Sequence, residues 1–363
     1  MVMPAPISTM ASSSDDIKLR NGFTSDAPPV NGSKPIPNGT KQPDLFPAYT
    51  PPTTGILSLL PPSWVPYGEL MRLEKPAGLY AFFAPFLLGT FHAANLSTPV
   101  PTPSHLAHLT TLFLAFSILS RGAACTWNDA LDAPFDRLVP RCRLRPLARR
   151  AIPLRSAHLF AATLTALSIA VLAALPGNCV PHAAVLTPLW LLYPFAKRVT
   201  HYPQVVLGFP FAWAVPIACS ALGVEAFSPA NRVATTALFA ANVLWTIVYD
   251  TVYAHQDAAA DVAAGVKSMA VRFGQRTKLL ASVLSVLQFG LLVVVGVQGG
   301  FGPLYLAGSC VGAALGMARM LVKVDLGDPA SCAWFFRHGF FEVGGCMVGG
   351  LVAQYLVRLG GGY

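Results

Sequence analysis

The chain has 363 residues, of which 54% are hydrophobic and only 11% are charged, and its mean hydropathy is +0.54. Soluble proteins carry about a quarter charged residues, so this composition argues against a soluble domain and predicts a polytopic membrane protein. The net charge of +9 indicates basic cytoplasmic loops and an anionic ligand rather than nucleic acid. The seven cysteines form no CxxC pair, which predicts neither a disulfide framework nor a zinc site.

The first stretch of the chain, residues 1–60, is rich in Pro, Ser, Gly, Asn and Asp and shows no hydrophobic periodicity. We therefore expect a disordered N-terminal tail there. The tail has no apolar signal-peptide core, and its acidic residues argue against a mitochondrial transit peptide. The remainder, residues 61–363, is predicted to form one transmembrane domain, which opens with an amphipathic segment over 64–75.

Nine apolar spans follow, each approaching the roughly 20 residues that a helix needs to cross a bilayer. They lie near residues 77–94, 104–125, 156–175, 180–196, 203–223, 232–255, 278–297, 301–322 and 339–358. The sequence thus predicts an all-α protein with about nine transmembrane helices in one bundle around a central cavity. The connections after the second, fourth, sixth and eighth spans carry Lys and Arg, so we expect them to face the cytoplasm together with the N-terminus.

Acidic residues gather at the cytoplasmic ends of two spans that lie four helices apart. At the end of the sixth span, Asp250, Asp257 and Asp261 are spaced i, i+7, i+11, which places them within about 20° of one line on a helix. No Gly or Pro interrupts 242–264, so we expect this helix to run through the cluster and stop at Gly265. Three carboxylates on one stripe repel one another unless a cation compensates their charge.

The other cluster ends the second span and contains Asn128, Asp132 and Asp136 at i, i+4, i+8, nearly on one face. Pro134 has no N–H to donate, so we expect the helix to kink or end there and to turn Asp136 away from the other two. Asp129 lies off the expected face and is a weaker candidate. An arginine-rich stretch follows, in which Arg141 and Arg145 are the better candidates for ligand contact and the other arginines fit simple positive-inside residues.

Oxygen ligands without His or Cys suit Mg²⁺, which proteins usually hold with a few carboxylates plus phosphate oxygens of the substrate. Nearby Arg and Lys supply charge for the remaining phosphate oxygens. Two such clusters on one side of the membrane predict a diphosphate site with two or more metal ions. The alternative is that the acidic side chains only form ion pairs with neighbouring arginines. That role would not require the acidic residues to share one face of a helix.

These patterns resemble the UbiA superfamily of intramembrane aromatic prenyltransferases over residues 64–358. The family's motifs are matched by Asn128-Asp129-x-x-Asp132-x-x-x-Asp136 with Arg145-Pro146-Leu147-Ala148, by Asp250, Asp257 and Asp261 with Gly265-Val266-Lys267-Ser268, by Tyr193-Pro194-x-x-Lys197-Arg198, by Pro203-Gln204-x-x-Leu207-Gly208, and by Arg72-Leu73-x-Lys75-Pro76-x-Gly78. The residues within the two acidic motifs, Ala133-Pro134-Phe135 and Ala254-His255-Gln256-Asp257, are most similar to those of fungal enzymes that prenylate polyketide-derived aromatics. Arg149-Arg150 departs from the family, which usually has Gly after a small residue there.

The resemblance implies Mg²⁺-dependent transfer of a prenyl group, expected to be farnesyl, from its diphosphate to an aromatic polyketide-derived phenol in meroterpenoid biosynthesis. By similarity, Asn128 and Asp132 hold one Mg²⁺, Asp257 and Asp261 hold the other, and Asp136 and Asp250 support them. Lys197, Arg141 and Lys267 would neutralise the diphosphate beside Tyr193. Arg72 would reach the diphosphate or an acidic acceptor, and the remaining expected substrate contacts are Lys75, Arg145, Arg198 and Ser268.

Three alternatives remain open at this point. One is the 4-hydroxybenzoate polyprenyltransferase of mitochondrial ubiquinone synthesis, against which the acidic tail argues. Another is a terpene cyclase of the same superfamily, and a third, from a different class, is a cation-coupled transporter. The expected partners are a prenyl diphosphate, an aromatic small molecule and the lipid bilayer, with no nucleic acid, and the expected location is the endoplasmic reticulum or another endomembrane with the active site open to the cytoplasm.

Overall fold

The computed structural model describes residues 49–137, 142–263 and 265–361, and these residues form helices and connecting segments without a β-strand. The elements in chain order are η1 Ile56–Leu59, α1 Val65–Leu70, α2 Ala77–Leu96, α3 Pro103–Asp136, α4 Leu154–Ala174, η2 Val180–His182, α5 Ala183–Val199, α6 Pro203–Ala212, α7 Ala214–Ala221, α8 Arg232–Ala254, η3 His255–Asp257, α9 Ala258–Ala263, α10 Met269–Phe273, η4 Gly274–Arg276, α11 Thr277–Gly299, α12 Pro303–Tyr305, η5 Leu306–Gly312, α13 Ala313–Lys323 and α14 Pro329–Leu359. The predicted all-α class is confirmed.

Eight helical stretches in the described part of the chain are long and apolar enough to cross a membrane. Each coincides with one of the predicted spans. The ninth predicted span, 180–196, corresponds to η2 and α5, and α5 has only 17 residues. The predicted number of nine is therefore approximate, and the chain is an integral, multi-pass membrane protein.

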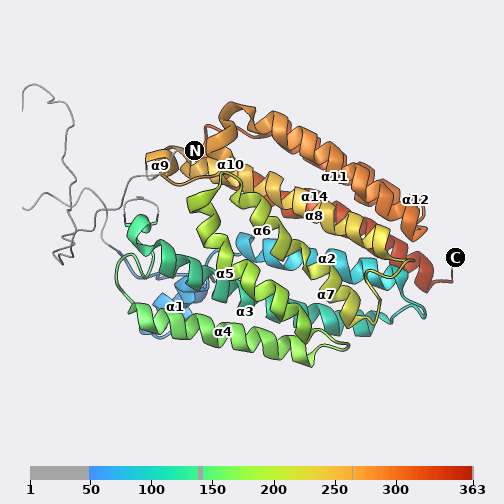
Figure 1. The fold of residues 1–363 in the computed structure, drawn as a ribbon, viewed down its shortest axis with the longest axis horizontal. Coiled ribbons are helices and arrows are strands. Elements are labelled where there is room, and N and C mark those ends of the chain that lie inside the picture. Colours follow the sequence, from blue (N-terminus) through green and yellow to red (C-terminus); the bar gives the residue numbers. More distant parts are fainter. Residues whose placement is uncertain (1–48, 138–141, 264, 362–363) are drawn as a thin grey trace, which may run out of the picture. The chain divides into compact units, whose positions relative to one another are not determined.

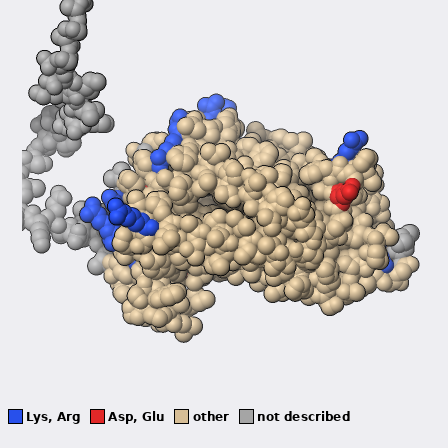
Figure 2. All heavy atoms as spheres, turned by 60° about the horizontal axis from the view of Figure 1, so that its bottom comes forward, with Lys and Arg blue, Asp and Glu red and all other residues tan. Residues whose placement is uncertain are grey.

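The long helices lie side by side, with their connecting segments at two opposite ends of the bundle (Figure 1). The end that carries α9, α10 and the loop 142–153 is called the motif end below, because both acidic clusters lie there. On the face drawn in Figure 2, charged side chains gather toward the two ends and leave a broad uncharged area between them. That distribution is what a lipid-facing band requires, because a charged side chain within hydrocarbon is costly.

The core of the bundle forms around α8 and α2. Helix α8 packs against α6, α11 and α14, while α2 packs against α3, α7 and α14. Trp245 of α8 and Tyr305 of α12 are among the largest fully buried side chains. These contacts bring the end of α3 and the end of α8, which carry the two clusters, to the same end of the bundle.

Helix α14 approaches the π-helical segment η5 closely, through glycines rather than through side chains. A Cβ atom added to Gly350 would lie 2.4 Å from Ser309 Oγ and 2.5 Å from Ser309 N. Ser309 Oγ also donates a hydrogen bond of 2.6 Å to the carbonyl oxygen of Met347. Small residues that allow backbones to approach are a common device of helix packing in membranes.

Two local predictions require correction. Helix α3 continues through Pro134 to Asp136, so the proline does not end it. Because Pro134 stands within the last turn, its missing N–H affects only the final part of the hydrogen-bond ladder. The predicted sixth helix does run through the cluster as far as Ala263, but it is not one regular α-helix, because α8 stops at Ala254 and a 3₁₀ turn, His255–Asp257, precedes α9. The tighter winding of that turn removes the simple phase relation between Asp250 and the two later aspartates.

Candidate active site

The first acidic motif divides into two stripes on α3. At 100° per residue, Asn128 and Asp132 lie about 40° apart, and Asp129 and Asp136 lie about 20° apart on a direction that is on average about 70° further around the helix. All four residues belong to the last turns of α3, at the motif end. The helix therefore presents its acidic residues to two different surroundings.

The stripe of Asn128 and Asp132 has few protein partners. Asn128 Oδ1 is buried and accepts no hydrogen bond among the described residues. Asp132 Oδ1 lies 3.6 Å from a terminal nitrogen of Arg198, a loose ion pair. Arg198 in turn donates a 3.0 Å hydrogen bond to the Leu131 carbonyl, which ties α5 to α3. Two oxygen donors thus face the site with much of their bonding capacity unused.

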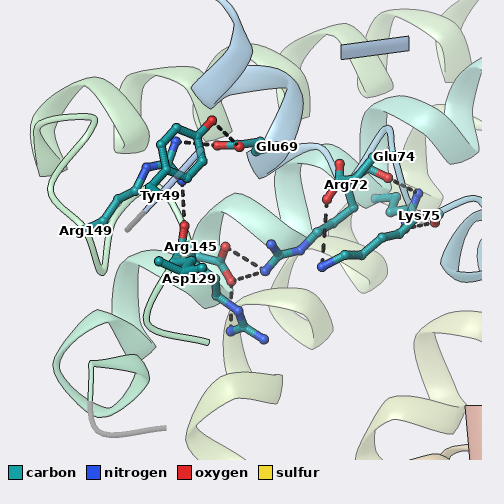
Figure 3. Close-up of polar contacts among 10 residues, drawn as sticks. Tyr49, Glu69, Arg72, Glu74, Lys75, Asp129, Arg145 and Arg149 are labelled. Carbon is teal, nitrogen blue, oxygen red and sulfur yellow. Dashed lines mark hydrogen bonds and ion pairs between the residues drawn. The ribbon is translucent and has the colours of Figure 1, made fainter. Parts of the chain in front are cut away.

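The stripe of Asp129 and Asp136 is bound to Arg72 and Arg145, and we call these four residues the clasp. Figure 3 shows both arginines at Asp129. One terminal nitrogen of Arg72 lies 2.7 Å from both carboxylate oxygens of Asp129. Arg145 Nη1 lies 3.2 Å from Asp129 Oδ1 and 3.0 Å from Asp136 Oδ2. The Asp129 side chain is only 1% exposed, so its charge is balanced by these arginines instead of by water.

The position of Arg145 between two carboxylates dominates its protonation. Burial alone would lower its pKa, but the charges of Asp129 and Asp136 outweigh burial and raise the pKa above its ordinary value. Arg145 is therefore firmly charged. Its guanidinium serves the clasp, since both of its acidic neighbours lie within hydrogen-bond distance.

Lys197 connects the two clusters. It interacts electrostatically with Asp132 of the first cluster, with Asp250 of the second and with Tyr193 one turn earlier on α5. Its ammonium group also lies 5.5 Å from the centre of the Tyr193 ring. One cation thus stands between carboxylates that are far apart in the sequence.

The second cluster is held by residues of α6 and of the segment before α10. Asp250 interacts with Gln204, whose side-chain oxygen accepts a hydrogen bond from Met269 N at 3.1 Å. Lys267 joins the same region, because its backbone N–H donates to the Lys197 carbonyl at 3.0 Å. Its ammonium group lies 3.5 Å from the Val199 carbonyl oxygen. Lys197 and Lys267 are therefore brought together.

The other predicted residues are distributed as follows. Asp257 lies on η3 and Asp261 on α9, and each has interaction partners in the protein. Ser268 caps α10 by accepting a hydrogen bond from Val271 N. Lys75 is 62% exposed and lies 3.8 Å from Glu74. Arg141 lies outside the described residues.

The donors around Lys197 fit Mg²⁺ in kind. No three His, Cys, Asp or Glu side chains within the described ranges converge closely enough to hold a metal ion by themselves. Mg²⁺ does not need such a cage, because it is usually bound through one or two carboxylates plus phosphate oxygens and water. The buried, unpartnered oxygen of Asn128 beside Asp132 is the observation that fits a ligand-completed site.

Two contributors to this end of the molecule were not singled out as site residues from the sequence. Gln204 orients Asp250, and its place in the Pro203-Gln204 signature was an available signal. Arg121 is buried within α3 and donates to the carbonyls of Arg72 at 3.1 Å and Lys75 at 2.6 Å. An arginine inside an apolar span was itself a signal, because burying such a residue costs free energy and it usually has a functional or structural role.

The departure at Arg149-Arg150 also has a structural reason. Arg149 lies 2.6 Å from Glu69 and stacks at 3.7 Å over the ring of Tyr49. Tyr49 donates its hydroxyl to the same glutamate, and burial together with that hydrogen bond raises the pKa of Tyr49. Arg150 has φ +61°, a left-handed conformation that glycine adopts without strain.

The chain belongs to the UbiA prenyltransferase family, whose model matches residues 82–343. It is therefore an enzyme of the prenyltransferase class. A prenyltransferase of Acremonium egyptiacum is 39% identical over 274 residues, which cover 75% of this chain and 81% of that protein. The DMOA farnesyltransferase of Aspergillus novofumigatus is 34% identical and covers 84% of this chain and 95% of its own length. The mitochondrial 4-hydroxybenzoate polyprenyltransferase of Saccharomyces cerevisiae is 35% identical, and the match covers 84% of this chain and 80% of that protein.

Solved structures share the fold. A UbiA homologue from Aeropyrum pernix K1 superposes with a TM-score of 0.60 at 23% identity, covering 77% of this chain and 98% of that one. A UbiA homologue from Archaeoglobus fulgidus, bound to DMAPP and Mg²⁺, gives a TM-score of 0.55 at 20% identity, covering 76% and 98%. At these identities the likeness establishes the helical architecture.

Proposed function

We propose that this chain transfers a farnesyl group from farnesyl diphosphate to an aromatic carbon of a polyketide-derived phenol, with Mg²⁺, in meroterpenoid biosynthesis. The observation that carries the proposal is Lys197, which stands between the oxygen donors of two clusters at one end of an apolar bundle. The relative named as a DMOA farnesyltransferase supports the choice of donor and acceptor class.

The residues present fit two metal sites. Asn128 and Asp132 would hold one Mg²⁺, and Asp257 and Asp261 would hold the other, with Asp250 in support. When bound, Mg²⁺ neutralises negative charge that develops on the diphosphate as the carbon–oxygen bond breaks. The UbiA homologue from Archaeoglobus fulgidus that is bound to DMAPP and Mg²⁺ supports metal-dependent prenyl transfer.

Lys197 performs the corresponding task without a metal, because a fixed ammonium group stabilises the departing diphosphate at no cost of reorganisation. Tyr193 accompanies that ammonium group, which lies 5.5 Å from the centre of its ring. The bond between the prenyl C1 and oxygen breaks, a bond forms between C1 and the aromatic carbon, and that carbon loses its proton, so the products are the farnesylated phenol, diphosphate and H⁺. The apolar bundle excludes water, which would otherwise capture the allylic cation.

The location proposed for the enzyme is an endomembrane such as the endoplasmic reticulum, with the motif end in the cytoplasm. Support comes from the basic residues of that end, which include Arg145, Lys197 and Lys267, and from the positive-inside rule. A second candidate function is 4-hydroxybenzoate polyprenyl transfer, because the yeast mitochondrial enzyme is 35% identical over 84% of this chain.

The test uses membranes that contain the full chain, supplied with Mg²⁺, with dimethylallyl, geranyl, farnesyl and longer diphosphates, and with phenolic acids that include 4-hydroxybenzoate. Mass spectrometry of the products identifies the joined pair, and we expect farnesyl on a polyketide-type phenol. Asp132→Asn and Asp257→Asn should abolish the product, whereas Glu225→Gln, an exposed residue at the opposite end, should not.

Other outcomes overturn the proposal. Long polyprenyl chains joined only to 4-hydroxybenzoate would identify the quinone-type enzyme. A hydrocarbon or alcohol formed from farnesyl diphosphate alone would identify a cyclase. Full activity of Asp132→Asn would show that the metal assignment is wrong.

A further inference from the structure

We propose that Asp129 is a positioning residue of the prenyl-transfer site, and that its partners Arg72 and Arg145 orient α3 instead of binding the diphosphate. The inference deepens the proposed function and rests on it for the effect on rate. The existence of the clasp itself does not depend on any reaction. Figure 3 shows its centre, where Arg72 from the segment before α2 and Arg145 from the loop after α3 both reach Asp129.

The first argument is charge balance. The clasp contains two arginines and two aspartates, so its formal charges cancel within the group. The side chains are mostly buried, with exposures of 12% for Arg72, 22% for Arg145, 1% for Asp129 and 9% for Asp136. If Arg72 turned to a diphosphate, it would leave a buried carboxylate with one partner fewer, which is strongly unfavourable.

The second argument is the way in which the clasp reaches α3. Arg121 and Asp129 are eight residues apart on that helix, or about 12 Å along its axis. Arg121 donates to the carbonyls of Arg72 and Lys75, while Asp129 binds the Arg72 side chain. The segment 72–75 is thus attached to α3 at two separate levels, which resists both rotation and tilting of the helix.

The backbone of Arg72 adds a third observation. Its φ of +57° lies in the left-handed region, which costs energy for a residue with a side chain. Such a conformation persists only when the surroundings over-determine it. Here the surroundings are the hydrogen bond from Arg121 to its carbonyl and the ion pair with Asp129.

These constraints matter because the side chains of Asn128 and Asp132 have few protein partners of their own. Among the described residues, Asn128 Oδ1 has no hydrogen-bond partner, and Asp132 has only the loose pair with Arg198 and the interaction with Lys197. The direction of both side chains is therefore set by the rotation of α3 about its axis. A misplacement of about 1 Å at a reacting group costs on the order of 100-fold in rate. Asp129, immediately after Asn128, fixes that rotation.

The kinetic test compares Asp129→Asn with Asp132→Asn. For Asp129→Asn we expect kcat to fall about 10–100-fold, the usual effect of losing an outer partner of a metal ligand. Its KM for the prenyl diphosphate and its thermal stabilisation by Mg²⁺ plus diphosphate should be retained. Asp132→Asn should lose that stabilisation. Because a single nitrogen of Arg72 contacts Asp129, Arg72→Lys should retain more kcat than Arg72→Gln.

Two kinetic outcomes overturn the proposal. If Asp129→Asn abolished stabilisation by Mg²⁺ plus diphosphate, Asp129 would be a metal ligand. If Arg72→Gln raised the KM for the diphosphate tenfold or more with kcat unchanged, Arg72 would be a substrate ligand.

A second measurement requires no catalysis, so it separates failure of the clasp from failure of the proposed function. Melting temperatures in detergent, without substrate, are measured for Arg72→Gln, Asp129→Asn and the double variant. If the two residues interact as a pair, the fall in melting temperature of the double variant is well below the sum of the falls of the two single variants. Strict additivity would show that the residues are not coupled and would overturn the clasp.

Discussion

The close contact between α14 and η5 allows a sharp prediction for Gly350→Ala. The new methyl group would stand 2.4 Å from Ser309 Oγ, 2.5 Å from Ser309 N and 3.0 Å from the Tyr305 carbonyl oxygen. Two of the three atoms belong to the backbone, so no side-chain rotation can relieve all of the overlap. The segments must separate by roughly 1 Å to reach ordinary contact.

That separation has two costs. It weakens the 2.6 Å hydrogen bond from Ser309 to Met347, and it removes part of the dispersion contact along the seam. Overpacking of this kind typically destabilises a protein by about 1–3 kcal/mol. Gly349→Ala provides the matched control, because a Cβ atom there would meet nothing within 4 Å.

The assay uses the protein's own buried thiols. Cys310 on η5 is 6% exposed and Cys332 on α14 is fully buried, so a thiol-reactive fluorescent dye reports unfolding on heating. Gly350→Ala should melt several degrees below the parent protein, and Gly349→Ala should melt at the same temperature as the parent protein. Equal melting of the two variants would refute the packing argument.

Two further predictions concern the motif end. Lys197→Met removes the cation between Asp132 and Asp250, so kcat for prenyl transfer should fall on the order of 100–1,000-fold, and unchanged steady-state kinetics would contradict its role. The exposed Arg276→Met is its control. Arg149→Ala removes the ion pair with Glu69 and the contact with the Tyr49 ring, so limited proteolysis should cut the segment before Glu69 faster than in Arg155→Ala. Identical cleavage in both variants would argue against that anchor.

Much of the architecture was predictable because lipid as a solvent leaves few alternatives. Every backbone polar group must be satisfied within a span, so a run of about 20 apolar residues is a helix almost by necessity. The bounds of α2 and α11, for example, differ from the predicted spans by at most two residues at either end. Local chemistry was harder to predict, and the 3₁₀ turn at His255–Asp257 left no mark in hydropathy.

The candidate site shows the same limit more clearly. Spacing along one helix tells which residues share a face, but it does not tell what that face meets. Arg72 and Asp129 are separated by 57 positions, and their pairing follows from the packing of the segment before α2 on α3. Arg150 looked anomalous for a glycine position, yet its left-handed backbone preserves the conformation that the position requires.

The clasp has a consequence for the order in which the active site is made. Its four residues, together with Asn128 and Asp132, all lie within the first 145 residues of the chain. Helices α2 and α3 are joined by the short connection 97–102 at one end and by the clasp at the other. A ribosome that has synthesised the chain as far as Arg145 has therefore supplied every residue of the clasp and the first pair of oxygen donors. Lys197 and then Asp250 are synthesised afterwards, so the second cluster and the cation near both clusters complete the site.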